Sequence, residues 1–188
     1  MPDLRIGIVG PESSGKTTLA EGLGDWLRDR GFSVALIEEQ GRLLAEDLPA
    51  GHRWGWREQR TTSLMHQAAE ARSALLLDLR STPTALVADG TTATPLVWHM
   101  SAVRHRPGYD VGHASITEEL VAAVEAAEYD LVLLTAPDLP WVADGIRDDP
   151  EGRDDAFELY RTLYPTAVVI TGESRLAQAR RAVGGRLS

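Results

Sequence analysis

The stretch GIVGPESSGKTTLAEGL, residues 7–23, decides the fold. It contains the end of an apolar run, a loop with glycines at positions 10 and 15, and the start of a helical pattern. The loop fits the spacing G-x-x-x-x-G-K-[ST], in which backbone N–H groups and a helix N-terminus hold phosphate. The sequence therefore predicts a phosphate-binding loop between a strand and a helix, and leaves open what happens to the phosphate.

The side chains of this loop have distinct expected roles. Lys16 is expected to reach the β- and γ-phosphate oxygens, and Thr17 to offer its hydroxyl to Mg²⁺. Lys16 is also the only lysine of the chain, since the other eighteen of its 19 basic residues are arginines. We expect the nucleotide to contact Gly10, Glu12, Ser13, Ser14, Gly15, Lys16, Thr17 and Thr18.

Length and composition favour one globular domain over residues 1–188, with 43% hydrophobic and 25% charged residues. No apolar run reaches the roughly 20 residues that a membrane-spanning helix needs, so we expect a cytoplasmic protein without a membrane partner. The net charge of -9 argues against a nucleic-acid partner. The chain has no cysteine, which excludes disulfides and thiolate metal sites.

Five apolar segments alternate with helical patterns along the chain. This order predicts an α/β fold of the P-loop NTPase type, with a five-stranded parallel sheet and helices on both faces. The expected strands are residues 4–9, 32–37, 84–88, 129–135 and 166–170. The expected helices are residues 16–30, 57–80, 95–103, 117–127, 154–164 and 174–183. In such sheets ligands bind beyond the carboxyl ends of the strands.

The longest helical pattern, residues 57–80, has an apolar stripe at three- and four-residue steps. The stripe consists of Leu64, Ala68, Ala71, Leu75 and Leu79.

A second motif places Asp89 at the end of the third expected strand, where a carboxylate can hold magnesium directly or through water. Switch proteins that read guanine use an Asn-Lys-x-Asp signature, which is impossible here because Lys16 is the only lysine. Motor ATPases usually need longer domains. A small-molecule kinase is therefore the favoured class.

A kinase also needs an acceptor site and positive charge over the transferred phosphoryl group. Glu39 and Arg42 follow the second expected strand. Residues 137–153 are long enough for a lid, from which Arg147 and Arg153 could cover the phosphates and help to exclude water.

Tryptophan is unusually frequent, with five Trp against two Phe. Near the expected strand ends, Trp rings could stack on a planar base, and Glu39 and Asp138 would suit a cationic pyridinium. The alternative is that the rings anchor loops by burial. The candidates are Trp54, Trp56, Trp98 and Trp141.

Several segments resemble the ribosylnicotinamide kinase domain of NadR-type proteins, and the resemblance covers about residues 5–182. They are GPESSGKTTL, EEQGR, HQAAEARSA, VADGTT followed by Trp98, and above all APDLPWVADGIR followed by Arg153. The resemblance implies a kinase that uses ATP and Mg²⁺ to phosphorylate the hydroxymethyl group of a nucleoside such as nicotinamide riboside.

Carried over by position, the resemblance assigns expected roles to several residues. It places Glu39, Arg42 and Trp98 near the acceptor, with Asp138, Trp141 and Asp144 at the acceptor pocket. It places Asp89 near Mg²⁺ and the acceptor hydroxyl, Arg147 and Arg153 in the lid, and the adenine near Gly172 and Arg175. Relatives often have an acid where this chain has Thr91 and an aromatic residue where it has Gln40, so the chain departs from the family on the acceptor side.

The sequence leaves four alternatives open. Either Glu39 or Asp89 could orient the acceptor hydroxyl. The acceptor could be a different hydroxylated metabolite. The chain could also be an ATP-dependent regulator that hydrolyses ATP slowly and signals through residues 137–152. The oligomeric state is undetermined, and a homodimer is among the states allowed.

Overall fold

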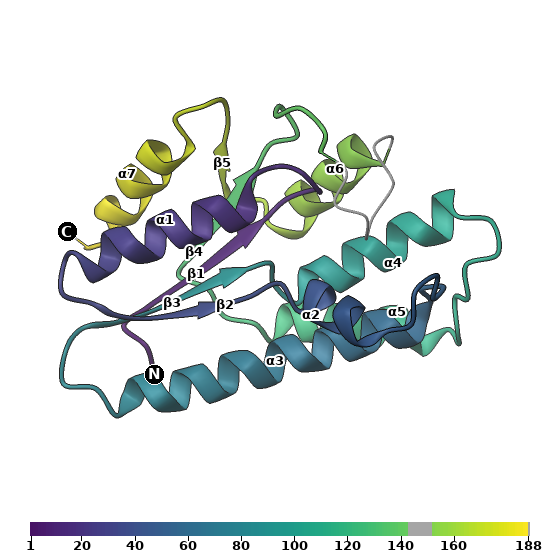
Figure 1. Ribbon diagram of the computed structural model, residues 1–188, viewed down its shortest axis with the longest axis horizontal. Coiled ribbons are helices and arrows are strands. Elements are labelled where there is room, and N and C mark those ends of the chain that lie inside the picture. The colour runs from purple at the N-terminus through teal and green to yellow at the C-terminus, as the bar shows by residue number, and fades with distance from the viewer. Residues whose placement is uncertain (143–151, 188) are drawn as a thin grey trace.

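The computed structural model describes residues 1–142 and 152–187. Within them the chain forms a five-stranded parallel sheet of order β2-β3-β1-β4-β5, which confirms the predicted fold class (Figure 1). The buried central strand β1 pairs with β3 on one side and with β4 on the other. The strands are β1 (Leu4–Val9), β2 (Ser33–Ile37), β3 (Thr84–Asp89), β4 (Leu131–Thr135) and β5 (Val168–Ile170).

Helices cover both faces of this sheet. Apolar residues of α1 and α7 pack on one face, and those of α3, α4, α5 and α6 pack on the other. None of the helices in residues 1–142 and 152–187 combines the length and apolar content needed to cross a bilayer. The helices are α1 (Lys16–Arg28), α2 (Gln40–Asp47), α3 (Trp56–Asp78), α4 (Ala93–His105), α5 (Ser115–Glu125), α6 (Arg153–Leu163) and α7 (Arg175–Leu187).

Sequence reasoning missed helix α2 and placed several boundaries differently. No helix was expected in the EEQGR segment, but α2 begins within it at Gln40. Only Gln40 and Gly41 of α2 are buried, so its sequence carries little apolar periodicity. Helix α4 begins two residues before its expected start, and β5 is limited to Val168–Ile170.

Helix α3 is present as predicted, but its apolar stripe faces outward. Leu64, Leu75 and Leu79 are 48%, 64% and 76% exposed, and Ala68 and Ala71 are also exposed. A surface helix normally turns such a stripe toward the core. The buried residues of α3 are instead mostly polar: Gln59, Thr62, Ser63, His66, Glu70 and Leu77.

A network of polar contacts explains why the polar face of α3 is buried. Arg5 Nη2 donates to Glu70 Oε2 over 2.8 Å, and His66 Nε2 lies 3.1 Å from Glu70 Oε1. The Tyr129 hydroxyl donates to the same Oε1 atom. Burial alone would raise the pKa of Glu70, but the hydrogen bonds from His66 and Tyr129 and the charge of Arg5 hold it below its ordinary value. The network therefore ties α3 to β1 and to the start of β4.

We predict that Glu70→Ala lowers the free energy of unfolding by about 3 kcal/mol, because it leaves the largely buried Arg5 side chain without its carboxylate. Urea denaturation followed by circular dichroism measures the change. Glu158→Ala is the matched control, since its ion pair with Arg161 is exposed and its loss should cost less than about 1 kcal/mol.

The stability lost in Glu70→Ala should depend on pH. The pKa of Glu70 is lower in the folded chain than its ordinary value of 4.5, so its stabilisation is present above that value and is lost as the pH falls further. The difference in the free energy of unfolding between wild type and Glu70→Ala should therefore become smaller at acid pH. Equal stability of the two proteins at neutral pH would contradict the assigned role of the network.

Candidate active site

The loop after β1 closes around a space suited to phosphate. Gly15 has a φ of 79° and directly precedes α1, so the first N–H groups of the helix point into the loop. Lys16 Nζ donates to Pro11 O over 2.8 Å, and Ser14 Oγ donates to the same carbonyl over 2.6 Å. The lysine thus curls back across the loop, where its ammonium can meet phosphate oxygens.

Gly10 is where the loop leaves β1, and only glycine fits there. A Cβ atom at this position would lie 2.2 Å from Thr135 Oγ1 and 2.6 Å from Thr135 O, and the φ of Gly10 is +148°. The Thr135 hydroxyl donates to Val9 O over 3.1 Å and lies 2.7 Å from Ser14 Oγ. The end of β4 therefore holds the phosphate loop directly.

Thr17 and Asp89, the two expected magnesium ligands, lie in contact. Thr17 Oγ1 donates to Asp89 Oδ2 over 2.6 Å, while the buried Asp89 Oδ1 has no hydrogen-bond partner among the described residues. Burial raises the pKa of Asp89, although the charge of Lys16 and the Thr17 hydrogen bond act in the opposite direction. A buried carboxylate oxygen without a partner beside a threonine hydroxyl is the type of oxygen donor set that Mg²⁺ prefers. These two residues therefore fit a magnesium ion.

Glu39 and Arg42 lie at the same edge of the sheet. They line a cleft of about 650 Å³ together with the phosphate loop from Glu12 to Thr18. Glu39 is 7% exposed and directly precedes α2. Glu39 and Asp89 line the same hollow beside β2, and the negative charge of Glu39 helps to raise the pKa of Asp89. The structure thus assembles two acids, one lysine and one arginine around the phosphate loop.

Arg153 attaches the start of α6 to the phosphate loop. Its guanidinium donates to Leu139 O over 3.2 Å and to Ser13 O over 3.3 Å, and it lies 5.7 Å from the centroid of the Trp141 ring. Ser13 Oγ also donates to Val142 O over 2.8 Å. The described ends of the expected lid therefore contact the loop that would hold the phosphates. Asp144 and Arg147 lie outside the described residues.

Asp138 lies on the side where the adenine was expected, rather than beside Trp98. It forms an ion pair with Arg175 and accepts a hydrogen bond from Gly172 N over 2.6 Å. Arg175 also donates to Ile170 O over 2.9 Å and to Ala136 O over 3.2 Å. These contacts bring Asp138, Gly172 and Arg175 into one cluster, which fixes the turn between β5 and α7 against the end of β4.

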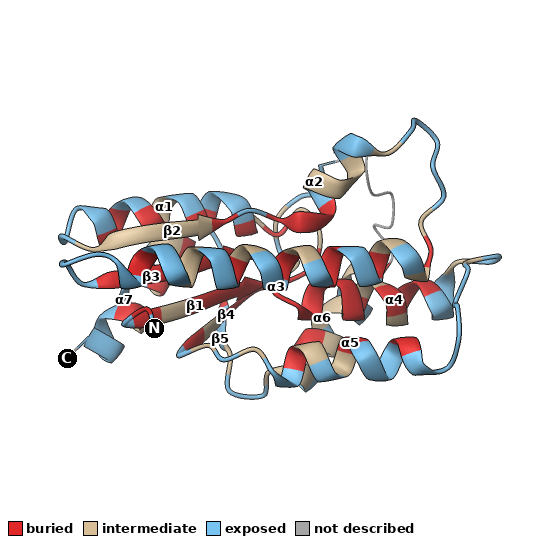
Figure 2. Cartoon of the chain, turned by 90° about the horizontal axis from the view of Figure 1, so that it is seen from below, coloured by how far each residue is buried: buried red, intermediate tan, exposed pale blue. Residues whose placement is uncertain are grey.

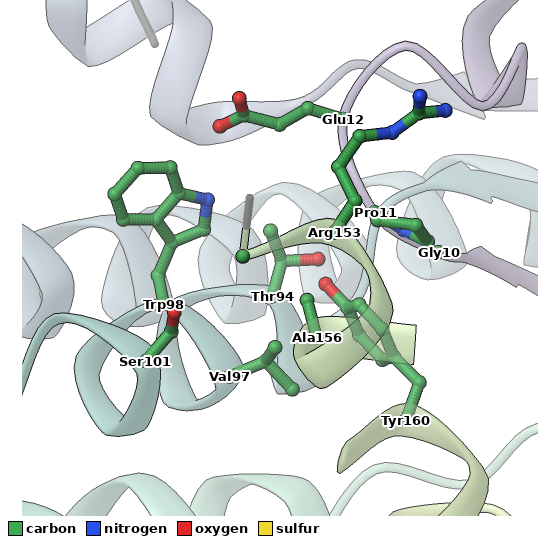
Figure 3. Close-up of a pocket in the computed structure, with 11 residues that line it drawn as sticks. Gly10, Pro11, Glu12, Thr94, Val97, Trp98, Ser101, Arg153, Ala156 and Tyr160 are labelled. Carbon is green, nitrogen blue, oxygen red and sulfur yellow. The ribbon is translucent and has the colours of Figure 1, made fainter. Parts of the chain in front are cut away.

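A separate, partly open pocket adjoins the phosphate loop (Figure 3), and the roughly 440 Å³ of empty space within it includes open solvent. Trp98 of α4 and Tyr160 of α6 lie on its sides, and Glu12 and Arg153 lie across from them. Its walls are mainly apolar, with a few polar groups from the loop, as is common in pockets for small organic molecules. Sequence reasoning found Trp98 but missed Tyr160, whose helix shows only an ordinary amphipathic pattern.

A second pocket, also partly open to solvent, lies on the other side of Thr94 and Trp98. It is lined by Trp54 and by Gln59 and Thr62 of α3. Gln59 and Thr62 were not predicted as site residues. Arg106 also lines it, with its guanidinium 4.5 Å from the centroid of the Trp98 ring.

Trp56, another predicted stacking candidate, is engaged elsewhere. Its ring packs edge-on against His113 with centroids 5.2 Å apart, and the Arg57 guanidinium lies 4.7 Å from it. Trp56 lines neither of the two pockets beside Trp98. In residues 1–142 and 152–187, histidine and carboxylate side chains form no cluster of three that could hold a metal ion.

The comparisons with known proteins agree with this fold. Residues 5–170 match a protein family described as an AAA domain. The comparison with curated protein sequences found no match. Among solved structures, NadR protein in complex with NR is similar with a TM-score of 0.70 and 19% identity over 97% of this chain. NadR in complex with NAD and AMP-PNP gives a TM-score of 0.68 at 17% identity over 97%.

Thymidylate kinases are also similar. Those from Candida albicans and Ehrlichia chaffeensis both have a TM-score of 0.63 and 16% identity, over 98% and 100% of this chain. The alignments cover 90% and 100% of these kinases, but only 51% and 49% of the two NadR chains, so this chain spans about half the length of NadR. The expected likeness to the NadR fold is confirmed.

We predict that Asp89→Asn removes most of the effect of Mg²⁺ on ATP binding, because an amide is a poorer ligand than the carboxylate oxygen that has no hydrogen-bond partner. Calorimetric titration with ATP should show at least about tenfold weaker binding in Mg²⁺, and an unchanged affinity in EDTA. Asp25→Asn, at an exposed residue of α1, is the control and should bind as wild type does. The same Mg²⁺ enhancement in Asp89→Asn would remove this residue from the metal site.

Proposed function

This chain belongs to the AAA domain family, and we propose that it is an ATP- and Mg²⁺-dependent kinase that phosphorylates a hydroxyl group of a nucleoside-like acceptor. One observation carries the proposal. The phosphate loop, the Thr17–Asp89 pair and Glu39 meet at one edge of the sheet, and the loop residue Glu12 also lines the cavity of Trp98 and Tyr160. A donor site and an aromatic acceptor site therefore share a wall.

On this proposal the loop and Lys16 hold the phosphates of ATP. Thr17 and Asp89 would hold Mg²⁺, which neutralises the charge that develops on the β- and γ-oxygens. Glu39 would orient the acceptor hydroxyl and take its proton as the acceptor oxygen bonds to the γ-phosphorus. The bond from that phosphorus to the β–γ bridging oxygen breaks, and ADP leaves. Asp89 remains the alternative group for orienting the hydroxyl.

Arg153 supports the same chemistry from the other side. It contacts the carbonyl of Ser13 in the loop and lines the cavity beside Trp98, so its positive charge lies between the two sites. Phosphoryl transfer relies mainly on positioning and charge stabilisation, and a fixed guanidinium at this border provides both. The adenine would lie near Gly172 and Arg175.

Nicotinamide riboside is the first acceptor to test. The sequence motifs resemble those of ribosylnicotinamide kinase domains, and the fold is similar to that of NadR solved with NR. Trp98 offers a ring on which a planar base can stack. The similarity to thymidylate kinases makes other nucleosides and nucleotides the next candidates.

The test is ADP release measured in Mg²⁺ and ATP, with and without a panel of nucleosides and nucleotides that includes nicotinamide riboside. We expect one member of the panel to raise the rate by at least about tenfold. An ATP-dependent regulator would instead show slow turnover that no acceptor changes. That result, without a phosphorylated product, would refute the kinase proposal.

We predict that Trp98→Leu raises the KM for the acceptor by about tenfold and leaves the KM for ATP unchanged, because the ring lines the acceptor cavity and makes no part of the phosphate loop. Steady-state kinetics with each substrate varied separately measure the two constants. Trp56→Leu is the matched control, because its ring packs on His113 outside the cavity. A larger change in the KM for ATP than in that for the acceptor would contradict the assignment.

A further inference from the structure

Helix α3 presents an unusual outer surface. Its exposed apolar stripe consists of Leu64, Ala68, Ala71, Leu75 and the C-cap residue Leu79, and runs along the C-terminal two thirds of the helix. Figure 2 shows α3 across the front of the molecule, with exposed segments along its length. The stripe covers 16 residues, or about 24 Å of helix at 1.5 Å per residue. Contiguous apolar surface of this kind on a soluble fold usually marks an interaction site.

The intramolecular contacts of α3 do not use this stripe. The helix attaches to the sheet through its opposite face, where Glu70 pairs with Arg5 and Tyr129, and Leu77 joins the core. The three leucines of the stripe therefore leave about half or more of their surface in water in a single chain. Exposed leucines cost solubility, so the pattern calls for a partner surface.

The order of the first four residues of the stripe is symmetric. Reading outward from the midpoint between residues 69 and 70, Ala68 corresponds to Ala71 and Leu64 to Leu75. A two-fold interface brings residue i of one copy to residue j of the other, and j to i. Two antiparallel α3 helices crossing at this midpoint would place each alanine against an alanine, and Leu64 against the second copy's leucine at position 75. Leu79 has no apolar counterpart, because it corresponds to Arg60.

We propose that α3 is the interface of a homodimer, formed by antiparallel packing of this stripe against the same stripe of a second copy. The small Ala68 and Ala71 side chains at the crossing point let the two helices approach closely. Leu64 and the second copy's leucine at position 75 then fill the space on either side. Antiparallel packing also aligns the two helix dipoles favourably.

The charges along the helix agree with this arrangement. About the same midpoint, Arg72 corresponds to Gln67, and Asp78 corresponds to Thr61. Neither of these two pairs places like charges against each other. A parallel pairing would instead place Arg72 against Arg72 and Asp78 against Asp78. The pattern therefore favours a second copy in the antiparallel direction, and it does so whether or not the chain is a kinase.

Sedimentation velocity tests the oligomeric state. The wild-type chain should sediment as a dimer, and Leu75→Glu should weaken dimerisation by at least about tenfold, because each interface loses a leucine contact on both sides and gains a buried charge. Leu187→Glu is the control: this leucine is 44% exposed on α7, across the sheet from α3, and its change should leave the dimer intact. A wild-type monomer, or a dimer that Leu75→Glu does not weaken, would overturn the proposal.

Disulfide trapping tests the direction of packing, since the chain has no cysteine of its own. Mixed Leu64→Cys and Leu75→Cys chains should form a disulfide-linked dimer on mild oxidation, whereas either variant alone should not. Identical positions in the antiparallel pair are 11 residues apart along the axis, or about 16 Å, which is beyond disulfide reach. Efficient cross-linking of Leu64→Cys to itself would contradict the antiparallel arrangement.

Discussion

The close approach of Gly10 to Thr135 is the constraint on which the site depends. A Cβ atom at position 10 would lie 2.2 Å from Thr135 Oγ1 and would clash. Because glycine has no Cβ atom, the loop after β1 can pack directly on the end of β4. The Thr135 hydroxyl then bonds to Val9 O and contacts Ser14, so it joins the two ends of the turn. This contact sets the position of the first turn of α1, and with it those of Lys16 and Thr17.

The neighbouring strands supply the other groups. Strand β3 lies on the opposite side of β1 from β4 and ends at Asp89, which therefore meets Thr17. Strand β2 lies beside β3 and leads to Glu39 at the start of α2. The site is thus a consequence of strand order, since the carboxyl ends of β2, β3, β1 and β4 lie side by side at one edge.

This dependence explains what could be predicted from the sequence. The phosphate loop is a local pattern, and Asp89 and Glu39 follow apolar strands whose ends must share an edge in a parallel sheet. Tyr160 and Gln59 lie within helices, where only the packing decides which side chains reach a cavity. Asp138 was expected near the acceptor, but its neighbours Gly172 and Arg175 come from more than 30 residues away.

Helix α3 shows most clearly that a sequence pattern does not determine which face of a helix is buried. Its periodicity predicts the helix correctly, but periodicity alone does not say whether the apolar or the polar side faces the sheet. Arg5 and Tyr129 decide that question, because they provide partners for the buried Glu70 from distant parts of the chain. The apolar side is left outward, available for a second copy.

The most direct test of the account follows the terminal phosphate of ATP itself. In a single turnover with γ-labelled ATP, Mg²⁺ and the acceptor that stimulates ADP release, the account predicts that the label moves to the acceptor as a phosphate ester. Little should appear as inorganic phosphate, because the acceptor hydroxyl occupies the position that water would otherwise take. Label found only in inorganic phosphate at saturating acceptor would contradict phosphoryl transfer.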